Sequence, residues 1–178
     1  MESRKVILFI AMSLDGFIAT ENDDLSFLDV VAIKGEDYGY AHFVNHVDTI
    51  IWGRKTYDKV VSFGGDIPYA DKKVYVISRT RSGTKGHVRF VDNVVALIEQ
   101  LKSEEGLDIY CDGGGEVVSE LLKHQLIDEM IISIIPHLLG SGKSLFKNNR
   151  PPQQLEFVNA KTFKSGLVQL RYKNFKPE

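Results

Sequence analysis

Short, almost continuously apolar runs are the feature that most constrains the fold of this chain. They are Lys5–Met12, Val47–Trp52, Val74–Ser78, Leu107–Cys111 and Asp128–Pro136, and each has the length of a strand. A strand that is apolar at nearly every position, rather than at every second one, is typical of a parallel sheet buried on both faces. Helices are therefore expected to cover both faces of the predicted sheet.

Helical patterns lie between these runs, as that arrangement requires. Apolar residues recur at helical spacing in Glu36–Val47 and in Gly115–Gln125, a third helix is expected from Thr56, and Asp92 is in position to cap a fourth. Strand and helix alternate along the chain, which predicts right-handed crossovers between parallel strands. The expected fold is α/β, a three-layer α/β/α sandwich with a mostly parallel central sheet.

The last part of the chain has a different pattern. Leu155–Lys161 and Gly166–Phe175 are strand candidates separated by the turn residues Lys164-Ser165-Gly166, so we expect a C-terminal antiparallel hairpin. The sequence contains no internal repeat, low-complexity stretch or linker composition. We therefore assign residues 1–178 to a single domain.

Charge and cysteine content restrict the partners. The formal net charge is -2 and no basic tract is dense, which argues against nucleic-acid or membrane partners and favours a small-molecule substrate. A single cysteine cannot form an intrachain disulfide or a multi-cysteine metal site. We therefore expect a cytoplasmic protein that uses no metal.

The segment Asp112–Glu116 joins a predicted strand directly to a predicted helix and contains three consecutive glycines. Glycines let the backbone approach a ligand closely, and the free N–H groups at the start of a helix bind phosphate. The segment indicates nucleotide binding, and the alternative is a tight turn without a ligand. It is not a Rossmann fingerprint, because Val118 occupies the last glycine position, and Gly140–Ser144 lacks the first glycine of a P-loop.

Two more turns follow predicted strands, at Trp52–Thr56 and at Ile77–Arg81. The carboxyl ends of parallel strands share one edge of a sheet, and ligands bind at that edge in open α/β folds. Arg54, Lys55 and Arg79 would supply cations for phosphate there. The alternative for each of them is solvated surface charge.

Five segments carry a family resemblance when they are taken in order: Met12–Ala19, Gly53–Tyr57, Val76–Arg79, Asp112–Glu116 and Pro136–Gly142. Their order and spacing cover nearly the whole chain. They are similar to those of the dihydrofolate-reductase-like superfamily. Within it, the chain most resembles the reductase domain of bacterial riboflavin biosynthesis and its stand-alone relatives.

The resemblance implies NADPH as the cofactor and assigns residues to each part of it. Ala11, Ile18 and Ala19 would line the nicotinamide pocket. The residues implied at the pyrophosphate are Gly53, Arg54, Lys55, Thr56, Gly113, Gly114, Gly115, Glu116 and Val117, and those implied at the adenosine 2′-phosphate are Ser78, Arg79 and Thr80. A basic residue at the latter position favours NADPH over NADH.

Two carboxyl groups are candidates for a catalytic acid. Asp37 falls where the folate reductases keep the carboxylate that binds the pterin and assists protonation, and Asp15 of the first loop is the other candidate. The alternative for Asp37 is that it complements a helix N-terminus. Asp112, Asp15 and Trp52 are expected to contact the substrate, and core packing is the alternative for Trp52.

The type of residue at two positions moves the expected substrate away from folate. Asp112 stands where folate reductases have an apolar residue and riboflavin-pathway reductases have an acid, and Val118 stands where folate reductases commonly have Tyr. The resemblance implies hydride transfer from NADPH to a small heterocycle, as in 5-amino-6-(5-phosphoribosylamino)uracil reductase. Dihydrofolate reductase proper and a non-catalytic NADPH-binding module remain the alternatives. Relatives look dimeric, so a homodimer is expected, with Asp128–Pro136 and Leu167–Phe175 as candidate faces.

Overall fold

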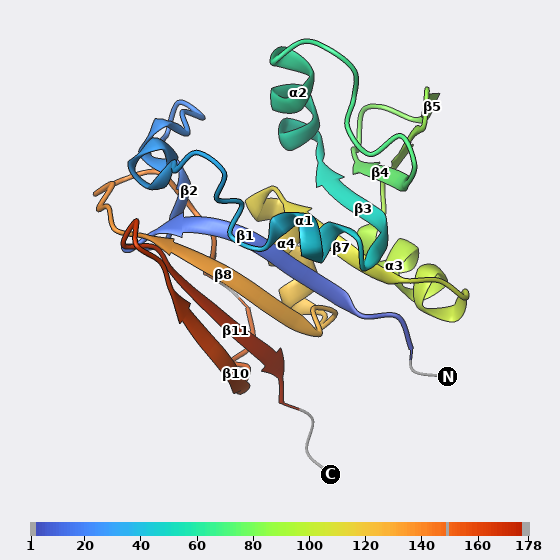
Figure 1. The fold of residues 1–178 in the computed structure, drawn as a ribbon. Coiled ribbons are helices and arrows are strands. Elements are labelled where there is room, and N and C mark those ends of the chain that lie inside the picture. The colour runs from blue at the N-terminus through green and yellow to red at the C-terminus, as the bar shows by residue number, and fades with distance from the viewer. Residues whose placement is uncertain (1–2, 149, 176–178) are drawn as a thin grey trace.

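The centre of the computed structural model, which describes residues 3–148 and 150–175, is a nine-stranded sheet. Its strands are β1 (Val6–Ser13), β3 (Val47–Gly53), β4 (Lys73–Ile77), β5 (Gly83–Lys85), β6 (Val88–Val91), β7 (Asp108–Gly113), β8 (Glu129–Ile135), β10 (Leu155–Thr162) and β11 (Val168–Asn174). They lie in the order β10-β11-β8-β1-β7-β3-β4-β6-β5 (Figure 1). Two short strands, β2 (Phe17–Ala19) and β9 (Lys143–Ser144), pair separately beside the sheet.

The central six strands of this sheet are parallel. β8, β1, β7, β3, β4 and β6 each run parallel to their neighbours. β5 is antiparallel to β6, and the hairpin of β10 and β11 joins β8 in antiparallel orientation. The predicted mostly parallel sheet with a C-terminal antiparallel hairpin is confirmed. Its consequence is that β3, β4 and β7, which are neighbours, end at the same edge.

Helices cover both faces and complete the three layers (Figure 1). On one face, α3 (Val94–Ser103) and α4 (Gly115–Lys123) bury apolar side chains such as Ile98 and Leu121 against the sheet. On the other face lie α1 (Tyr40–Val44), α2 (Arg54–Ser62) and a 3-10 helix, η1 (Ser26–Val31). Burial of the apolar faces of these helices supplies most of their stability, because helices this short are only marginally stable in isolation.

Two predicted helix starts differ from the observed ones. The helix expected over Glu36–Val47 is limited to α1, because Tyr38 and Gly39 adopt left-handed φ angles of 56° and 81° that a helix cannot contain. The cap of α3 is Asn93 and not Asp92, since the Asn93 side chain accepts a hydrogen bond from Ala96 N at 3.0 Å.

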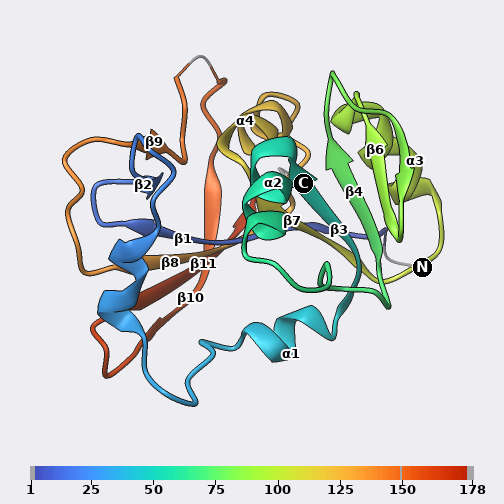
Figure 2. The ribbon, with the colours of Figure 1, turned by 90° about the horizontal axis from the view of Figure 1, so that it is seen from above.

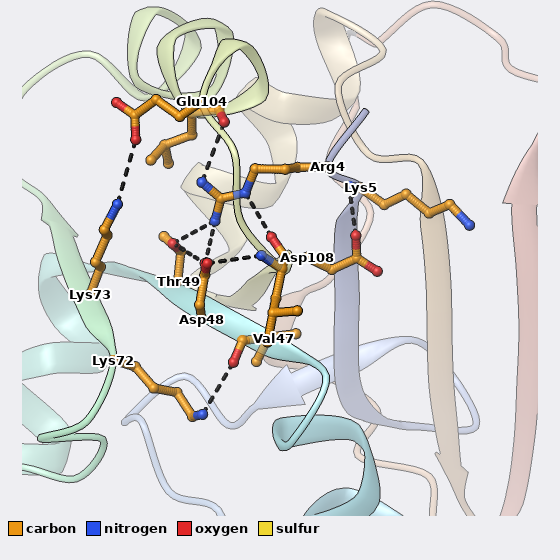
Figure 3. Close-up of polar contacts among 11 residues, drawn as sticks. Arg4, Lys5, Val47, Asp48, Thr49, Lys72, Lys73, Glu104 and Asp108 are labelled. Atoms are coloured by element: carbon orange, nitrogen blue, oxygen red, sulfur yellow. Dashed lines mark hydrogen bonds and ion pairs between the residues drawn. The ribbon is translucent and has the colours of Figure 1, made fainter. Parts of the chain in front are cut away.

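A buried ionic cluster fixes the amino ends of the parallel strands (Figure 3). Arg4 precedes β1 and is only 4% exposed. It donates a hydrogen bond to Asp48 near the start of β3 and forms an ion pair with it. Its guanidinium also donates to Thr49 Oγ1 at 2.8 Å and to the Leu107 carbonyl at 2.6 Å. Asp48 in turn accepts from Leu107 N at 2.9 Å. One cation therefore links β1, β3 and the segment that enters β7.

Candidate active site

The turns after β3 and β7 touch each other at the carboxyl edge of the sheet. Gly114, with φ of 72°, is in a conformation that favours glycine. A Cβ atom built on Gly114 would lie 3.4 Å from Thr56 Oγ1 and 3.5 Å from Gly53 Cα. The two turns are therefore packed in ordinary van der Waals contact, and the positive φ of Gly114 is the reason for a glycine at that position.

Two helices begin at this contact, α2 after Gly53 and α4 after Gly114 (Figure 2). Neither helix has a side chain that caps its first turn. The unsatisfied N–H groups and positive helix ends of two nine-residue helices are thus side by side. The predicted pyrophosphate residues of both turns, Gly53–Thr56 and Gly113–Val117, come together here and form a cradle suited to an anion.

Glu116 and Val117 contribute backbone rather than side chains to this cradle. The Glu116 side chain is 76% exposed and lies 3.7 Å from Lys147 Nζ, whereas Val117 is buried in the core beneath the turn. A carboxylate that points outward leaves the N–H groups of the turn accessible to a phosphate. The position therefore suits an anion despite its acidic residue.

Three arginines lie near the same edge of the sheet and differ in whether they form ion pairs. Arg54 Nη1 is 2.7 Å from Asp58 Oδ2, and Arg81 Nη1 is 2.6 Å from Asp58 Oδ1, so one carboxylate neutralises part of both charges. Arg79 and Lys55 are exposed and have no ion-pair partner among the residues that the structure describes. Arg79 is the cation of the β4 turn that remains available to a ligand.

Ser78 shapes this turn. Its hydroxyl accepts hydrogen bonds from Thr80 N at 3.3 Å and from Arg81 N at 3.0 Å, and its own N–H donates to the Val91 carbonyl at 2.8 Å. Ser78 is 4% exposed, whereas Thr80 is exposed. The predicted role of Ser78 at a 2′-phosphate therefore becomes one of holding Arg79 and Thr80 in place.

A cavity of about 460 Å³ lies beside α2 and the β4 turn. Its walls include Tyr57, Phe90 and Arg81, whose guanidinium carbon lies 6.0 Å from the centre of the Tyr57 ring. The Tyr57 hydroxyl is buried without a hydrogen-bond partner within the described parts of the chain. A buried polar atom without a partner commonly marks a place where a ligand or water belongs.

Asp112, near the end of β7, is the carboxyl group of the site whose pKa is raised. Its Oδ2 accepts a hydrogen bond from Trp52 Nε1 at 2.6 Å, and its Oδ1 accepts one from the Tyr110 hydroxyl at 2.6 Å. Burial raises the pKa of Asp112 above its ordinary value, and the two hydrogen bonds lower it in part. The other carboxyl groups with a clearly shifted pKa all have a lowered one, and these are Asp15, Asp24, Asp37, Glu104, Glu120 and Glu129. Asp112 is thus suited to hold a proton.

Trp52 contributes its N–H group rather than its ring face. The residue is 1% exposed and packs 6.4 Å from the Tyr57 ring and 5.8 Å from the Tyr69 ring, measured between ring centres. Core packing, the alternative to stacking on a ligand, therefore describes the ring. The expected contact with substrate is replaced by a hydrogen bond that orients Asp112.

Three tyrosines surround Asp112, and the sequence did not indicate them. Tyr40 of α1 and Tyr69 of the segment before β4 are hydrogen-bonded through their hydroxyls, and Tyr40 also interacts with Tyr110. Burial raises the pKa of each of the three. They come from separate parts of the chain, so no local spacing indicates that they meet. All three remain neutral hydrogen-bonding groups at physiological pH.

Asp15 joins two loops through hydrogen bonds to its carboxylate. Its carboxylate accepts hydrogen bonds from the Ser13 hydroxyl at 2.5 Å, from Leu139 N at 3.1 Å and from Gly140 N at 2.7 Å. The Ser13 bond, with help from the two backbone donors, lowers the pKa of Asp15. An exposed carboxylate that loses its proton readily is poorly suited to be a general acid. The bonds instead fasten the loop after β1 to the loop after β8.

Asp37 binds backbone N–H groups at the start of α1 and is not a buried acid. It is exposed, and its carboxylate accepts hydrogen bonds from Ala41 N at 2.9 Å and from Gly39 N at 2.9 Å. These two bonds lower its pKa. Both the exposure and the direction of the shift favour the alternative stated above, that Asp37 complements the N-terminus of a helix.

The predicted nicotinamide residues lie at the opposite side of the glycine turn. A Cβ atom built on Gly115 would lie 3.8 Å from Ile18 Cδ1, so Ile18 of β2 is adjacent to the cradle. Ala19 follows it and is 7% exposed. Ala11 of β1 packs against the apolar cluster of η1. Small and apolar side chains here leave a low-polarity wall beside the phosphate cradle.

Comparison with known proteins agrees with this architecture. The chain is 40% identical over 171 residues to the uncharacterized protein YwjB of Bacillus subtilis, covering 95% of this chain and 97% of that protein. A crystal structure of a putative riboflavin biosynthesis protein from Shewanella is 34% identical, with a TM-score of 0.88 and coverage of 97% and 99%. A diaminohydroxyphosphoribosylaminopyrimidine deaminase/5-amino-6-(5-phosphoribosylamino)uracil reductase from Thermotoga maritima has the same fold, with 18% identity, a TM-score of 0.69, and coverage of 97% of this chain and 57% of that chain.

The family model for the RibD C-terminal domain matches residues 4–169, which is most of the chain. The Shewanella and Thermotoga structures share the overall fold of this chain, which is dihydrofolate-reductase-like. No helix within the described residues is both long and apolar enough to span a membrane. The chain belongs to the RibD C-terminal domain family and has a dihydrofolate-reductase-like fold.

Proposed function

We propose that this protein is an NADPH-dependent reductase that transfers hydride to a small heterocyclic substrate, similar to 5-amino-6-(5-phosphoribosylamino)uracil reductase. The observation that carries the proposal is the position of Asp112. A carboxyl group with a raised pKa immediately precedes Gly113 and Gly114, which form part of an anion cradle. Such a pair supplies an acid next to a cofactor-binding turn.

The cofactor would be held mainly by backbone groups. The N–H groups after Gly53 and Gly114 would bind the pyrophosphate, and Arg79 with Thr80 would bind the 2′-phosphate. Ala11, Ile18 and Ala19 would form the apolar wall of the nicotinamide pocket. When bound, NADPH supplies the hydride, and the protein's own contribution is orientation and exclusion of water.

In this proposal Asp112 is the catalytic acid. Its partly buried carboxyl group has a pKa raised by burial, so it keeps its proton to a higher pH than an ordinary carboxyl group and donates it to a nitrogen or oxygen of the substrate. Trp52 orients the carboxyl group through its 2.6 Å hydrogen bond. Asp15 then fastens the first loop to the segment around Gly140, and Asp37 stabilises α1.

Cofactor binding is tested first by thermal unfolding with NADPH and NADH. A ligand at about one hundred times its Kd adds about 2.7 kcal/mol to the free energy of unfolding, so NADPH should raise the melting temperature more than NADH does. The absence of any shift with either nucleotide would contradict the proposal.

Catalysis is tested by following the oxidation of NADPH with a ribosylaminopyrimidine phosphate and with dihydrofolate. Oxidation only with the pyrimidine supports the proposed substrate class, and oxidation only with dihydrofolate contradicts it. If NADPH binds but neither substrate is reduced, the result matches the non-catalytic NADPH-binding module. The Asp112→Asn variant serves as the control for background oxidation of NADPH.

The proposal includes a homodimer in the cytoplasm. β10 is an eight-residue strand at the edge of the sheet with Phe157 58% and Val158 41% exposed, and an exposed apolar edge strand favours pairing with another chain. A second copy that pairs along β10 would cover these side chains. Sedimentation of the wild type and of Val158→Lys tests this, since the variant should shift the population to monomers. A wild type that sediments as a monomer contradicts it.

A further inference from the structure

The Tyr110 hydroxyl lies between two acceptors, Asp112 and the Phe9 carbonyl, beside the Tyr40 hydroxyl with which it also interacts, and it can donate to only one group at a time. Asp112 Oδ1 is 2.6 Å from the Tyr110 oxygen, and the Phe9 carbonyl oxygen is 3.2 Å from it. A phenol has a single hydrogen to donate but can also accept a hydrogen bond. The geometry therefore contains two alternative arrangements of the same three groups.

Each arrangement matches one protonation state of Asp112. When the carboxyl group is ionised, Tyr110 donates to Oδ1. When Oδ1 carries the proton, it donates to the Tyr110 oxygen, and the Tyr110 hydrogen turns to the Phe9 carbonyl. In both states the carboxyl group keeps a hydrogen-bond partner, so neither state leaves a buried polar atom unsatisfied.

We propose that Tyr110 is a positioning residue that changes its acceptor between Asp112 and the Phe9 carbonyl as Asp112 loses and regains its proton. This inference rests on the proposed function, in which Asp112 protonates the substrate. The proton leaves Oδ1 for the substrate, and a proton from water restores it. Only protons move in this exchange, and no group is oxidised or reduced.

The surroundings of Asp112 contain no titrating group that competes with it near neutral pH. The ionisable residues that face it are Tyr40 from α1, Tyr69 from the segment before β4, and Tyr110 with Cys111 from β7. Burial raises the pKa of all four, which keeps them neutral. Within the described residues, no basic side chain forms an ion pair or hydrogen bond with Asp112. Among the described residues, a transition in this cluster at a pH below the pKa values of these four groups therefore belongs to Asp112.

Two probes report on the exchange in the protein without cofactor. Trp52 is the single tryptophan of the chain and its Nε1 donates to Asp112 Oδ2, so its fluorescence should follow the ionisation of Asp112. The carbonyl ¹³C resonance of Phe9 should follow the hydrogen bond from Tyr110. The inference predicts that both signals change with the same midpoint as pH is raised from about 4 to about 9.

Variants separate the exchange from a merely structural hydroxyl. Tyr110→Phe removes a donor that favours the ionised carboxyl group, so the Trp52 midpoint should rise by about one pH unit. In the same variant the Phe9 resonance should no longer titrate, and Asp112→Asn should abolish both transitions. Tyr75→Phe is the matched control, because Tyr75 packs on the other face of the sheet and should leave both signals unchanged.

Three results would overturn the inference: a constant Phe9 resonance while Trp52 titrates, an unchanged Trp52 midpoint in Tyr110→Phe, or no transition at all in the wild type. The wild-type ¹³C measurement decides the matter even if Tyr110→Phe folds poorly. Since no cofactor is present, a failure of NADPH binding refutes the proposed function and leaves these titrations interpretable on their own.

Discussion

The indole nitrogen of Trp52 lies 2.6 Å from Oδ2 of Asp112, so a core side chain points its one polar atom at the carboxyl group of the site. Trp52 and Asp112 are the last residues but one of β3 and β7, and the two strands are neighbours in the sheet. The orientation of the acid is thus built into the pairing of two parallel strands. A loop would hold the same group less rigidly.

Replacement of Asp112 by Asn should remove the proton donor while preserving its shape. We expect kcat for NADPH-dependent reduction to fall about 10²–10⁴-fold, the usual contribution of a general acid. The Kd for NADPH should change little, because the cradle is formed by backbone. Steady-state kinetics and a binding titration test this, with the surface substitution Asp92→Asn as control. A variant with wild-type kcat would exclude Asp112 as the acid.

The pH dependence of activity should follow the protonated form of Asp112. Because burial raises its pKa, the rate should be highest below that pKa and decline as pH rises through it. Trp52→Phe removes a hydrogen bond that lowers the pKa, so the decline should move to higher pH. A pH series of kcat for both proteins measures the two midpoints, and a shift to lower pH in Trp52→Phe would contradict the assignment.

Gly114→Ala should block the cofactor site. The added methyl group would contact Thr56 and Gly53 at 3.4–3.5 Å, and the φ of 72° adds backbone strain of about 1–3 kcal/mol. Affinity for NADPH should fall at least about tenfold. Gly35→Ala is the matched control, because its φ of 84° imposes similar strain while no atom lies near the new methyl group. Equal affinities in the two variants would count against the cradle.

Arg79→Ala should distinguish the two nicotinamide cofactors. A charge-assisted hydrogen bond to the 2′-phosphate contributes about 1.5–3 kcal/mol, so the Kd for NADPH should rise about 10- to 100-fold while that for NADH stays nearly constant. Arg81→Ala should have a smaller effect, since Asp58 already pairs with Arg81 at 2.6 Å. Calorimetric titration of both variants with both nucleotides gives the comparison. Equal weakening of NADPH and NADH in Arg79→Ala would show that the assignment is wrong.

Loss of Arg4 should reduce stability without altering the site. Arg4→Ala leaves Asp48 without its cation and should lower the free energy of unfolding by about 3–5 kcal/mol. Arg89→Ala, an exposed arginine of β6, should change it by no more than about 0.5 kcal/mol. Urea unfolding measures both values. Similar stability of the two variants would mean that the cluster in Figure 3 does not hold the strands together.

The parallel sheet was predictable because its central strands are apolar at nearly every position, and both glycine turns lie directly after such strands. β6 was not predicted, because its four residues include the exposed Arg89 and give too short a pattern. The burial of Arg4 was also not predictable, since a charged residue is expected at the surface unless its partners are known.

The acid end of the site was the least predictable part. Sequence comparison by position selected Asp37 and Asp15, yet the environment of a carboxyl group depends on residues that fold around it. The tyrosines around Asp112 come from α1, from the segment before β4 and from β7, and only tertiary packing brings them together. A raised pKa is a property of that packing and has no signature in the linear chain.

The strands β3 and β7 begin at the Arg4 cluster and end at the two glycine turns. The contacts that anchor the strands and the candidate site thus lie at opposite ends of β3 and β7. Substitutions that adapt the carboxyl end to a new substrate do not disturb the contacts that keep the sheet assembled. Such a separation places the sequence positions that hold the sheet together apart from those that would shape a ligand site.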